Sequence, residues 1–149
     1  MLLKFINSLY ARGLYVGNIP GAPGTWGSIL ACFLLICFPE IFSNILVLVL
    51  LFFTGVISSS YETKITNIHD DGRIVIDEIL GLFVVFIGIP HKFWLLILGF
   101  FMFRFFDIIK PLWIADSQKL SGGWGIMTDD LLAGIVTNII LRVIVIYIF

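Results

Sequence analysis

Charged side chains are scarce in this chain, and their scarcity excludes most classes of protein. Lys, Arg, Asp and Glu make up 13% of the 149 residues, whereas hydrophobic residues make up 60% and the mean hydropathy is +1.09. Soluble domains carry roughly 25% charged residues, so a membrane protein is predicted instead. A net charge of −1 provides no basic surface for a phosphate backbone, which excludes nucleic acid as a partner.

Cysteine is also rare, and the signatures of several hydrolases are missing. Cys32 and Cys37 lie five residues apart, which matches neither a CxxC redox pair nor a zinc site, so we interpret both as apolar packing residues. The chain has no Cys-x5-Arg thiolate site, no Asp-x-Asp-x-Thr/Val nucleophile, no Lys-x6-Arg-Pro segment, no P-loop and no serine hydrolase signature. Those routes to phosphate-ester or acyl chemistry are therefore excluded.

Long apolar segments, separated by turn signals, fill most of the chain and predict an all-α fold. Two short turns that contain proline, Pro39-Glu40 and Pro90-His91-Lys92, favour helical hairpins. We expect one domain over residues 1–149, a compact membrane-embedded helical bundle with about five main helices arranged partly as hairpins. The expected helices are Trp26–Phe38, Ile41–Ser60, Ile79–Ile89, Phe93–Phe106 and Leu131–Phe149.

The distribution of basic residues orients this bundle. If each hairpin enters the bilayer and returns, one side carries Lys4, Arg12, Lys64, Arg73, Arg104, Lys110 and Lys119, whereas Lys92 lies at a tip on the other side. By the positive-inside rule, the side with more cations faces the cytoplasm of a multi-pass protein. A span needs roughly 20 residues, so two of the expected helices are short, and between two and five crossings are expected.

Five acidic residues lie at the ends of the apolar segments, where a carboxylate is costly. They are Asp77, Glu78, Asp107, Asp129 and Asp130. An ionised carboxylate against hydrocarbon costs several kcal/mol unless cations or donors accompany it, which favours a functional role for these residues. Carboxylates without His or Cys partners select Mg²⁺ rather than zinc.

Two of these acidic groups occur in a similar short sequence pattern. Asp77-Glu78 precedes Gly81, and Asp129-Asp130 precedes Ala133-Gly134, so each acid pair lies about one helical turn before a small residue. Small residues let helix backbones approach closely in a membrane, and the two helices would then bring their carboxylates together. The alternative is that acids simply favour helix N-termini through the helix dipole.

Basic residues flank the third acid at helical spacing. Arg104, Asp107 and Lys110 are three residues apart and face one side of a helix. Arg can bind a phosphate through two hydrogen bonds and Lys adds a charge. The alternative is a structural network in which Asp107 neutralises its neighbours.

A segment rich in Gly and Pro, residues 17–28, leads into the first apolar run and delivers Thr25 or Ser28 to its start. Either hydroxyl would cap the helix. Two interpretations stay open. The free backbone N–H groups at such a helix start could bind a phosphate, or the segment could be an ordinary capped turn that leads into the helix.

Four blocks in series resemble the phosphatidylglycerophosphatase A family. They are residues 23–28 (PGTWGS), 74–81 (IVIDEILG), 103–111 (FRFFDIIKP) and 122–134 (GGWGIMTDDLLAG). The resemblance implies an Mg²⁺-dependent phosphatase of the bacterial inner membrane. Such an enzyme converts the lipid phosphatidylglycerophosphate into phosphatidylglycerol and inorganic phosphate, a step of phospholipid biosynthesis.

On this resemblance, Mg²⁺ is expected on Asp77, Glu78, Asp129 and Asp130. Arg104 and Lys110 are the expected phosphate ligands, with Thr25 and Ser28 as further candidates. Whether water attacks directly or an aspartate forms a phosphoenzyme stays open, and Asp107 is the candidate nucleophile in the second case.

Two rival functions are weighed against the enzyme. A small ion-coupled carrier or channel subunit would distribute its acids through the depth of the bilayer, whereas these acids gather on one predicted face. A non-catalytic assembly partner would not need Arg104, Asp107 and Lys110 at helical spacing. The oligomeric state is left open.

Overall fold

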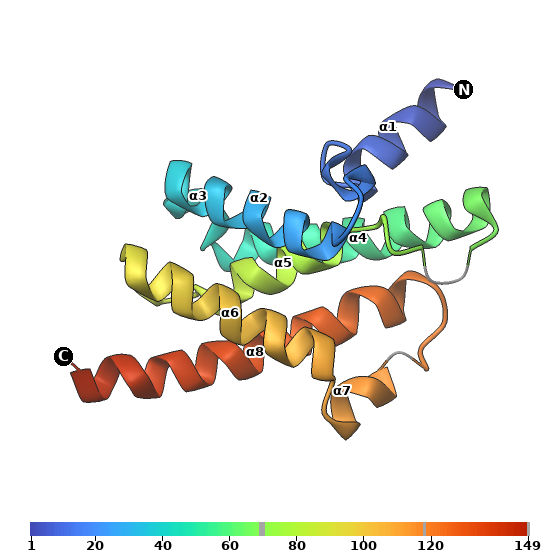
Figure 1. Ribbon diagram of the computed structural model, residues 1–149. Coiled ribbons are helices and arrows are strands. Elements are labelled where there is room, and N and C mark those ends of the chain that lie inside the picture. Colours follow the sequence, from blue (N-terminus) through green and yellow to red (C-terminus); the bar gives the residue numbers. More distant parts are fainter. Residues whose placement is uncertain (69–70, 118, 149) are drawn as a thin grey trace.

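The computed structural model describes residues 1–68, 71–117 and 119–148, and these residues form helices and no strand (Figure 1). The all-α prediction is therefore confirmed. The elements are α1 (Leu2–Ala11), the 3₁₀ turn η1 (Val16–Asn18), α2 (Pro23–Cys37), α3 (Pro39–Phe42), α4 (Ile45–Thr66), α5 (Ile76–Val85), α6 (Phe93–Ile109), α7 (Leu112–Ser117) and α8 (Gly123–Ile148).

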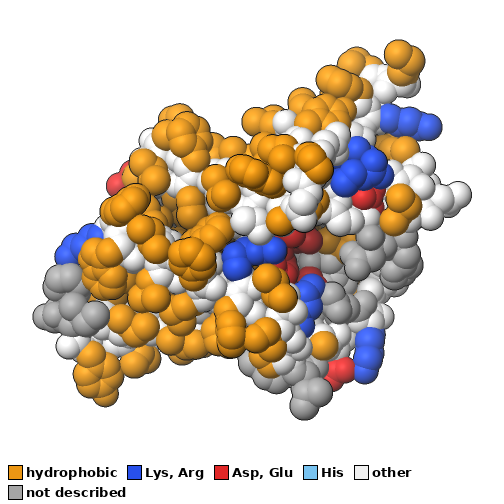
Figure 2. Space-filling view, in the orientation of Figure 1, with side chains coloured by type: hydrophobic (Ala, Val, Ile, Leu, Met, Phe, Trp, Pro, Cys, Tyr) orange, Lys and Arg blue, Asp and Glu red, His pale blue; other side chains and the backbone are white. Residues whose placement is uncertain are grey.

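Within the described ranges, two helices are long and apolar enough, by length and composition, to cross a membrane. α4 has 22 residues, and the candidate span of α8, Gly123–Tyr147, has 25. At about 1.5 Å per residue, each exceeds the ~30 Å hydrocarbon core of a bilayer. Figure 2 shows apolar side chains over most of one face of the molecule, as a lipid-facing surface requires.

The short helix α5 occupies the centre of the bundle and packs against α2, α4, α6 and α8 (Figure 1). Successive long helices run antiparallel, as the hairpins predict. The two helices of each predicted hairpin are not each other's main packing partners, however. In the first hairpin, α5 lies between α2 and α4; in the second, α5 packs more extensively against α8 than against α6. From Ile79 to Phe86 every side chain of this segment is buried.

Helix α5 ends inside the bundle, and α8 satisfies its last carbonyl groups. Ten residues span only about 15 Å, so these carbonyls lie where no water replaces the missing helical partners. Asn138 Nδ2 donates to Val85 O at 2.7 Å and to Ile87 O at 3.0 Å, and an Arg142 guanidinium nitrogen donates to Ile87 O at 2.7 Å. These bonds explain why Asn138 and Arg142 occur in the mainly apolar C-terminal half of α8.

Several helix boundaries differ from the expectation. α2 begins at Pro23, a favourable first residue because it has no N–H to satisfy. Its N-cap is Ala22, without a side-chain cap, so the prediction that Thr25 or Ser28 caps it was wrong. α8 begins at Gly123 rather than Leu131, and its expected last residue, Phe149, lies outside the described residues.

The other boundaries shift by a few residues. The expected helix Ile41–Ser60 is divided into α3 and α4, and Asn44 caps α4 by accepting a hydrogen bond from Leu46 N at 2.9 Å. α5 begins three residues early, which places Asp77 and Glu78 in its first turn. Neither α1 nor α7 was among the expected helices.

Two glycines bring α5 and α8 into backbone contact. A methyl group at Gly134 would lie 2.3 Å from the Gly81 carbonyl oxygen, and one at Gly81 would lie 2.7 Å from Asp130 O. Only glycine permits this approach at either position. The prediction that these two helices pack at their small residues is confirmed.

A buried glutamate that the sequence analysis missed ties α1 to α4. Glu62 is fully buried and accepts hydrogen bonds from Asn7 Nδ2 at 2.9 Å, Ser8 Oγ at 2.9 Å and Arg12 Nε at 2.9 Å. An Arg12 guanidinium nitrogen also lies 2.7 Å from Glu62 Oε1. The three donors come from one short stretch of α1, so this network positions the N-terminal helix.

Gly134→Ala is expected to destabilise the protein by about 3 kcal/mol or more, because its methyl group meets backbone that cannot move aside. Thermal unfolding in detergent, followed by circular dichroism, measures the effect. Gly72→Ala is the control, since nothing lies within 4 Å of a methyl group there. Equal unfolding temperatures for Gly134→Ala and the wild type would contradict the close contact.

Glu62→Ala is expected to lower the free energy of unfolding by roughly 3 kcal/mol, because it removes the carboxylate that neutralises the largely buried Arg12 guanidinium. Urea unfolding in mild detergent gives the value. The exposed Glu40 provides a matched control, and Glu40→Ala is expected to change stability little. Similar values for the two variants would show that the network does not stabilise the fold.

Candidate active site

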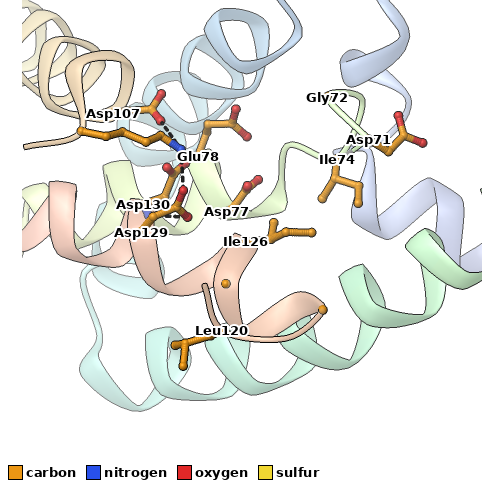
Figure 3. A pocket seen from close by; sticks show the side chains of 13 residues that line it. Asp71, Gly72, Ile74, Asp77, Glu78, Asp107, Leu120, Ile126, Asp129 and Asp130 are labelled. Atoms are coloured by element: carbon orange, nitrogen blue, oxygen red, sulfur yellow. Dashed lines mark hydrogen bonds and ion pairs between the residues drawn. The ribbon is translucent and has the colours of Figure 1, made fainter. Parts of the chain in front are cut away.

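A polar pocket of about 250 Å³ lies where α5 begins, α6 ends and α8 begins (Figure 3). The segments around Gly72 and Gly122 form other parts of its wall. Its charged lining residues are Asp71, Asp77, Glu78, Asp107, Lys110, Asp129 and Asp130. All five acids singled out in the sequence therefore lie in one place, and we call it the acidic pocket.

Three of these acids form a cluster with an excess of negative charge, because among the described residues Arg104, 3.9 Å from Glu78, is the cation that contacts it. One carboxylate oxygen each from Asp77, Glu78 and Asp130 lie within 4.8 Å of one another. Asp77 Oδ1, Glu78 Oε2 and Asp130 Oδ2 are buried and have no hydrogen-bond partner among the described residues. We call these residues the acid trio. Buried acceptors in such a group require a bound positive charge or protons.

The other two acids are paired with the two basic residues of the site. Arg104 donates to Asp107 Oδ2, and its guanidinium lies 3.9 Å from Glu78 Oε1. Lys110 donates to Asp129 Oδ2, and its ammonium lies 3.9 Å from Asp107 Oδ1. The cations thus form a row that borders the acid trio.

The end of α6 turns Lys110 toward α8. Lys110 is the C-cap and has φ +45° and ψ 72°, in the left-handed region that non-glycine residues seldom adopt. Pro111 follows and cannot continue the helix. The helix therefore stops at the residue whose ammonium reaches Asp129, and a non-glycine residue in this conformation is typical of a functional position.

The start of α2 packs directly over the site. A methyl group at Gly24 would lie 2.2 Å from Glu78 Oε1 and 2.9 Å from an Arg104 guanidinium nitrogen. Ser28 is buried, and its hydroxyl donates to Gly24 O at 2.9 Å. Thr25 and Ser28 are not among the residues that line the acidic pocket.

Asp71 extends the pocket toward α1 and was not singled out from the sequence. It accepts from Arg73 Nε at 2.8 Å and from an Arg73 guanidinium nitrogen at 2.7 Å, and Arg12 lies 3.9 Å away. The hydrogen bonds from Arg73 lower the pKa of the Asp71 carboxyl. Asp71-Gly72-Arg73 is an ordinary turn sequence, so nothing in the sequence indicates that Asp71 lines the pocket.

The model of one family, phosphatidylglycerophosphatase A, matches residues 9–145. The chain belongs to the phosphatidylglycerophosphatase A family. Membership makes it an enzyme, a phosphatase of phosphate monoesters in phospholipid metabolism, and does not favour the ion-carrier alternative. Together with the two long apolar helices, it makes the chain a membrane protein.

Curated relatives agree with this family. The phosphatidylglycerophosphatase A of Haemophilus influenzae is 40% identical over 89% of this chain and 84% of its own length. The Escherichia coli protein of the same name is 35% identical over 87% of this chain and 77% of its own length. A Bacteroides thetaiotaomicron protein named putative phosphatidylinositol-3-phosphatase is 32% identical over 94% of each chain. No solved structure matches.

The pairing of Asp71 predicts a pH dependence. Because its pKa is lowered in the folded protein, its stabilising effect is present above the ordinary value of about 3.9 and is lost as the pH falls through the lower value. Asp71→Asn should therefore destabilise the protein modestly at pH 7, and by progressively less as the pH falls from about 4 toward 2. Unfolding temperatures across that range test this; a constant difference would contradict the pairing.

Proposed function

We propose that this chain hydrolyses the terminal phosphate of phosphatidylglycerophosphate in the acidic pocket, with Mg²⁺ held by the acid trio. The observation that carries the proposal is the cluster of Asp77, Glu78 and Asp130. Each of these residues keeps a buried carboxylate oxygen without a hydrogen-bond partner among the described residues, and Arg104 and Lys110, which pair with Asp107 and Asp129, lie beside the cluster. A divalent cation and a phosphomonoester together would complement these charges.

The donor set of the acid trio fits Mg²⁺. All of its candidate ligands are carboxylate oxygens, and no His or Cys lines the pocket among the described residues. Hard oxygen ligands of this kind favour Mg²⁺ over zinc. When bound, the ion would polarise the phosphoryl oxygens and offset the charge of the acids. Asp129, which pairs with Lys110, would support this site by orienting that lysine.

Arg104 and Lys110 would bind the substrate phosphate. Arg104 Nε is buried and has no partner among the described residues, so it offers an unused donor at the edge of the acid trio. Asp107 holds the rest of that guanidinium in place. We leave Thr25 and Ser28 out of the proposed ligands because they do not line the pocket and the Ser28 proton is donated to Gly24 O.

In the proposed reaction, water attacks phosphorus and the bond from phosphorus to the glycerol oxygen breaks. Water supplies the hydroxyl of the released phosphate and the proton of the released alcohol, so the equation balances. Arg104 and Lys110 would stabilise the charge that develops on the other phosphoryl oxygens. Asp107 is a poor nucleophile in this arrangement, since Arg104 occupies its Oδ2 and Lys110 lies 3.9 Å from its Oδ1.

The proposed substrate is a lipid whose headgroup is presented at the cytoplasmic surface. The excess of basic residues on the side of the acidic pocket favours that orientation. The name of the Bacteroides relative suggests phosphatidylinositol 3-phosphate as a second candidate substrate. Both lipids carry a phosphomonoester that the same charges would bind.

Phosphate release from purified protein in detergent tests the function. Phosphatidylglycerophosphate, phosphatidic acid and phosphatidylinositol 3-phosphate are compared, each with Mg²⁺ and with a chelator. We expect the fastest release from phosphatidylglycerophosphate, and only with Mg²⁺. Release mainly from phosphatidylinositol 3-phosphate would replace the proposed substrate, and no release from any lipid would overturn the proposal.

Asp77→Asn and Asp130→Asn are each expected to lower Mg²⁺-dependent release by roughly a hundredfold or more, because several kcal/mol of charge stabilisation are lost. Asp116→Asn is the matched control, since Asp116 pairs with Lys119 at the exposed surface. Wild-type rates for either trio variant would remove that residue from the metal site.

Direct attack by water predicts that no phosphoenzyme forms. The protein is mixed with substrate labelled in the terminal phosphate, quenched in acid within milliseconds and examined for label on the polypeptide. We expect none. Label on Asp107 that disappears in Asp107→Asn would instead establish a covalent mechanism.

A further inference from the structure

A groove open to the surroundings runs between α2 and α6. It has a volume of about 270 Å³, and every residue that lines it is apolar. The lining includes Ile29, Cys32 and Ile36 from α2 and Phe93, Ile97 and Phe101 from α6. From Ile29 to Ile36 the groove follows about 10 Å of helix.

The groove leads to the acidic pocket. Phe100 and Phe101 line it near one end, and Arg104 follows them by four and three residues, on the same side of α6. On the facing helix, Gly24 lies five residues before Ile29 and packs against Arg104 and Glu78. Arg104, whose guanidinium borders the acid trio, therefore lies about one turn beyond the lining residues at this end of the groove.

We propose that the α2–α6 groove binds one acyl chain of the lipid substrate while its phosphate lies at Arg104. This inference rests on the proposed function, because it assigns a binding site to the apolar part of that substrate. The apolar groove matches an acyl chain, and the cation beyond its end matches a phosphate. Along α6, apolar residues are therefore followed by a basic residue, just as the acyl chain of a phospholipid is followed by its phosphate. The substrate would enter sideways from the bilayer between the two helices.

A second apolar groove, which we call the α4–α8 groove, is a poorer candidate for the acyl chain because its end toward the acidic pocket is closed. It has about 370 Å³ and lies between α4, α5 and α8, with Val49, Val84 and Ile135 in its wall. Toward the acidic pocket, α4 and α8 close on each other. A methyl group at Gly123 would lie 2.1 Å from Val56 O, and one at Gly55 would lie 2.5 Å from the Met127 terminal methyl carbon.

Aromatic packing reinforces that closure. The Trp124 ring lies 5.8 Å from the Phe52 ring and 6.2 Å from the Phe53 ring, measured between centroids. A chain in the α4–α8 groove would thus meet packed helices where a chain in the α2–α6 groove meets Arg104. The α4–α8 groove serves as an internal control.

Two cysteines on α2 provide matched variants. Cys32 lines the α2–α6 groove, whereas Cys37 is exposed five residues further on and does not line it. Cys32→Phe fills the groove and Cys37→Phe does not. Val49→Phe fills the α4–α8 groove. Phosphate release is measured with long-chain phosphatidylglycerophosphate and with a diacetyl analogue, whose two-carbon chains are too short to occupy the groove.

Cys32→Phe is expected to raise KM for the long-chain substrate about tenfold, the effect of losing roughly two buried methylenes. Its kcat, and both constants for the short analogue, should stay near the wild-type values. Cys37→Phe and Val49→Phe should leave both substrates unaffected. No change in Cys32→Phe, or an equal change in Val49→Phe, would overturn the groove assignment.

Crosslinking of the wild type keeps the test independent of any variant that fails to fold. A phosphatidylglycerophosphate with a diazirine on one acyl chain is irradiated with the protein in chelator, and the labelled peptides are identified. We expect label on α2 and α6 and weaker label from a phosphatidylcholine carrying the same chain. Equal labelling by both lipids, or label mainly on α4 and α8, would show bulk lipid and overturn the proposal. A wild type that is inactive on both chain lengths would instead reject the proposed function.

Discussion

The site depends on one close approach, the backbone contact between α5 and α8 at Gly81 and Gly134. In each helix an acidic residue lies about one turn before the glycine, so bringing the backbones together also brings Glu78 and Asp130 together. Any larger side chain at these glycines would separate the two halves of the acid trio. The contact is therefore part of the main packing interface of the central helix, and it also sets the distance between the acids of α5 and α8.

The charges around this contact are arranged in two groups. Asp107 and Asp129 pair with Arg104 and Lys110, which reduces the cost of burying them. The acid trio retains carboxylate oxygens without a partner. Burial of such a cluster is unfavourable by itself, and it is explained most directly by a ligand that supplies positive charge.

Much of this could be predicted from the sequence, because its signals were local. Apolar segments predicted the helices, and the spacing of Asp77 to Gly81 and Asp130 to Gly134 predicted that α5 and α8 meet. The division of the acids into a free trio and paired residues is a tertiary property with no local signal. Glu62 was missed for the same reason, since its partners Asn7, Ser8 and Arg12 are distant in the sequence. Asp71 was missed because its contact with the neighbouring Arg73 is one that an ordinary loop also makes.

Helix boundaries were the least predictable part of the fold. The last helix was expected to begin at Leu131, yet α8 begins at Gly123, because the lack of a side chain lets this residue pack against Val56 O of α4. Tertiary packing here outweighs the low helix propensity of glycine. The earlier start places Asp129 and Asp130 within the helix, where Asp130 meets the acids of α5 and Asp129 meets Lys110 at the end of α6.

Binding of Mn²⁺, used in place of Mg²⁺, tests most directly whether the acid trio is a metal site. Electron paramagnetic resonance of the purified protein measures free and bound ion during a titration. The account predicts saturable binding to the wild type that Asp130→Asn loses and that Asp116→Asn retains. Equal binding to the wild type and Asp130→Asn would contradict it.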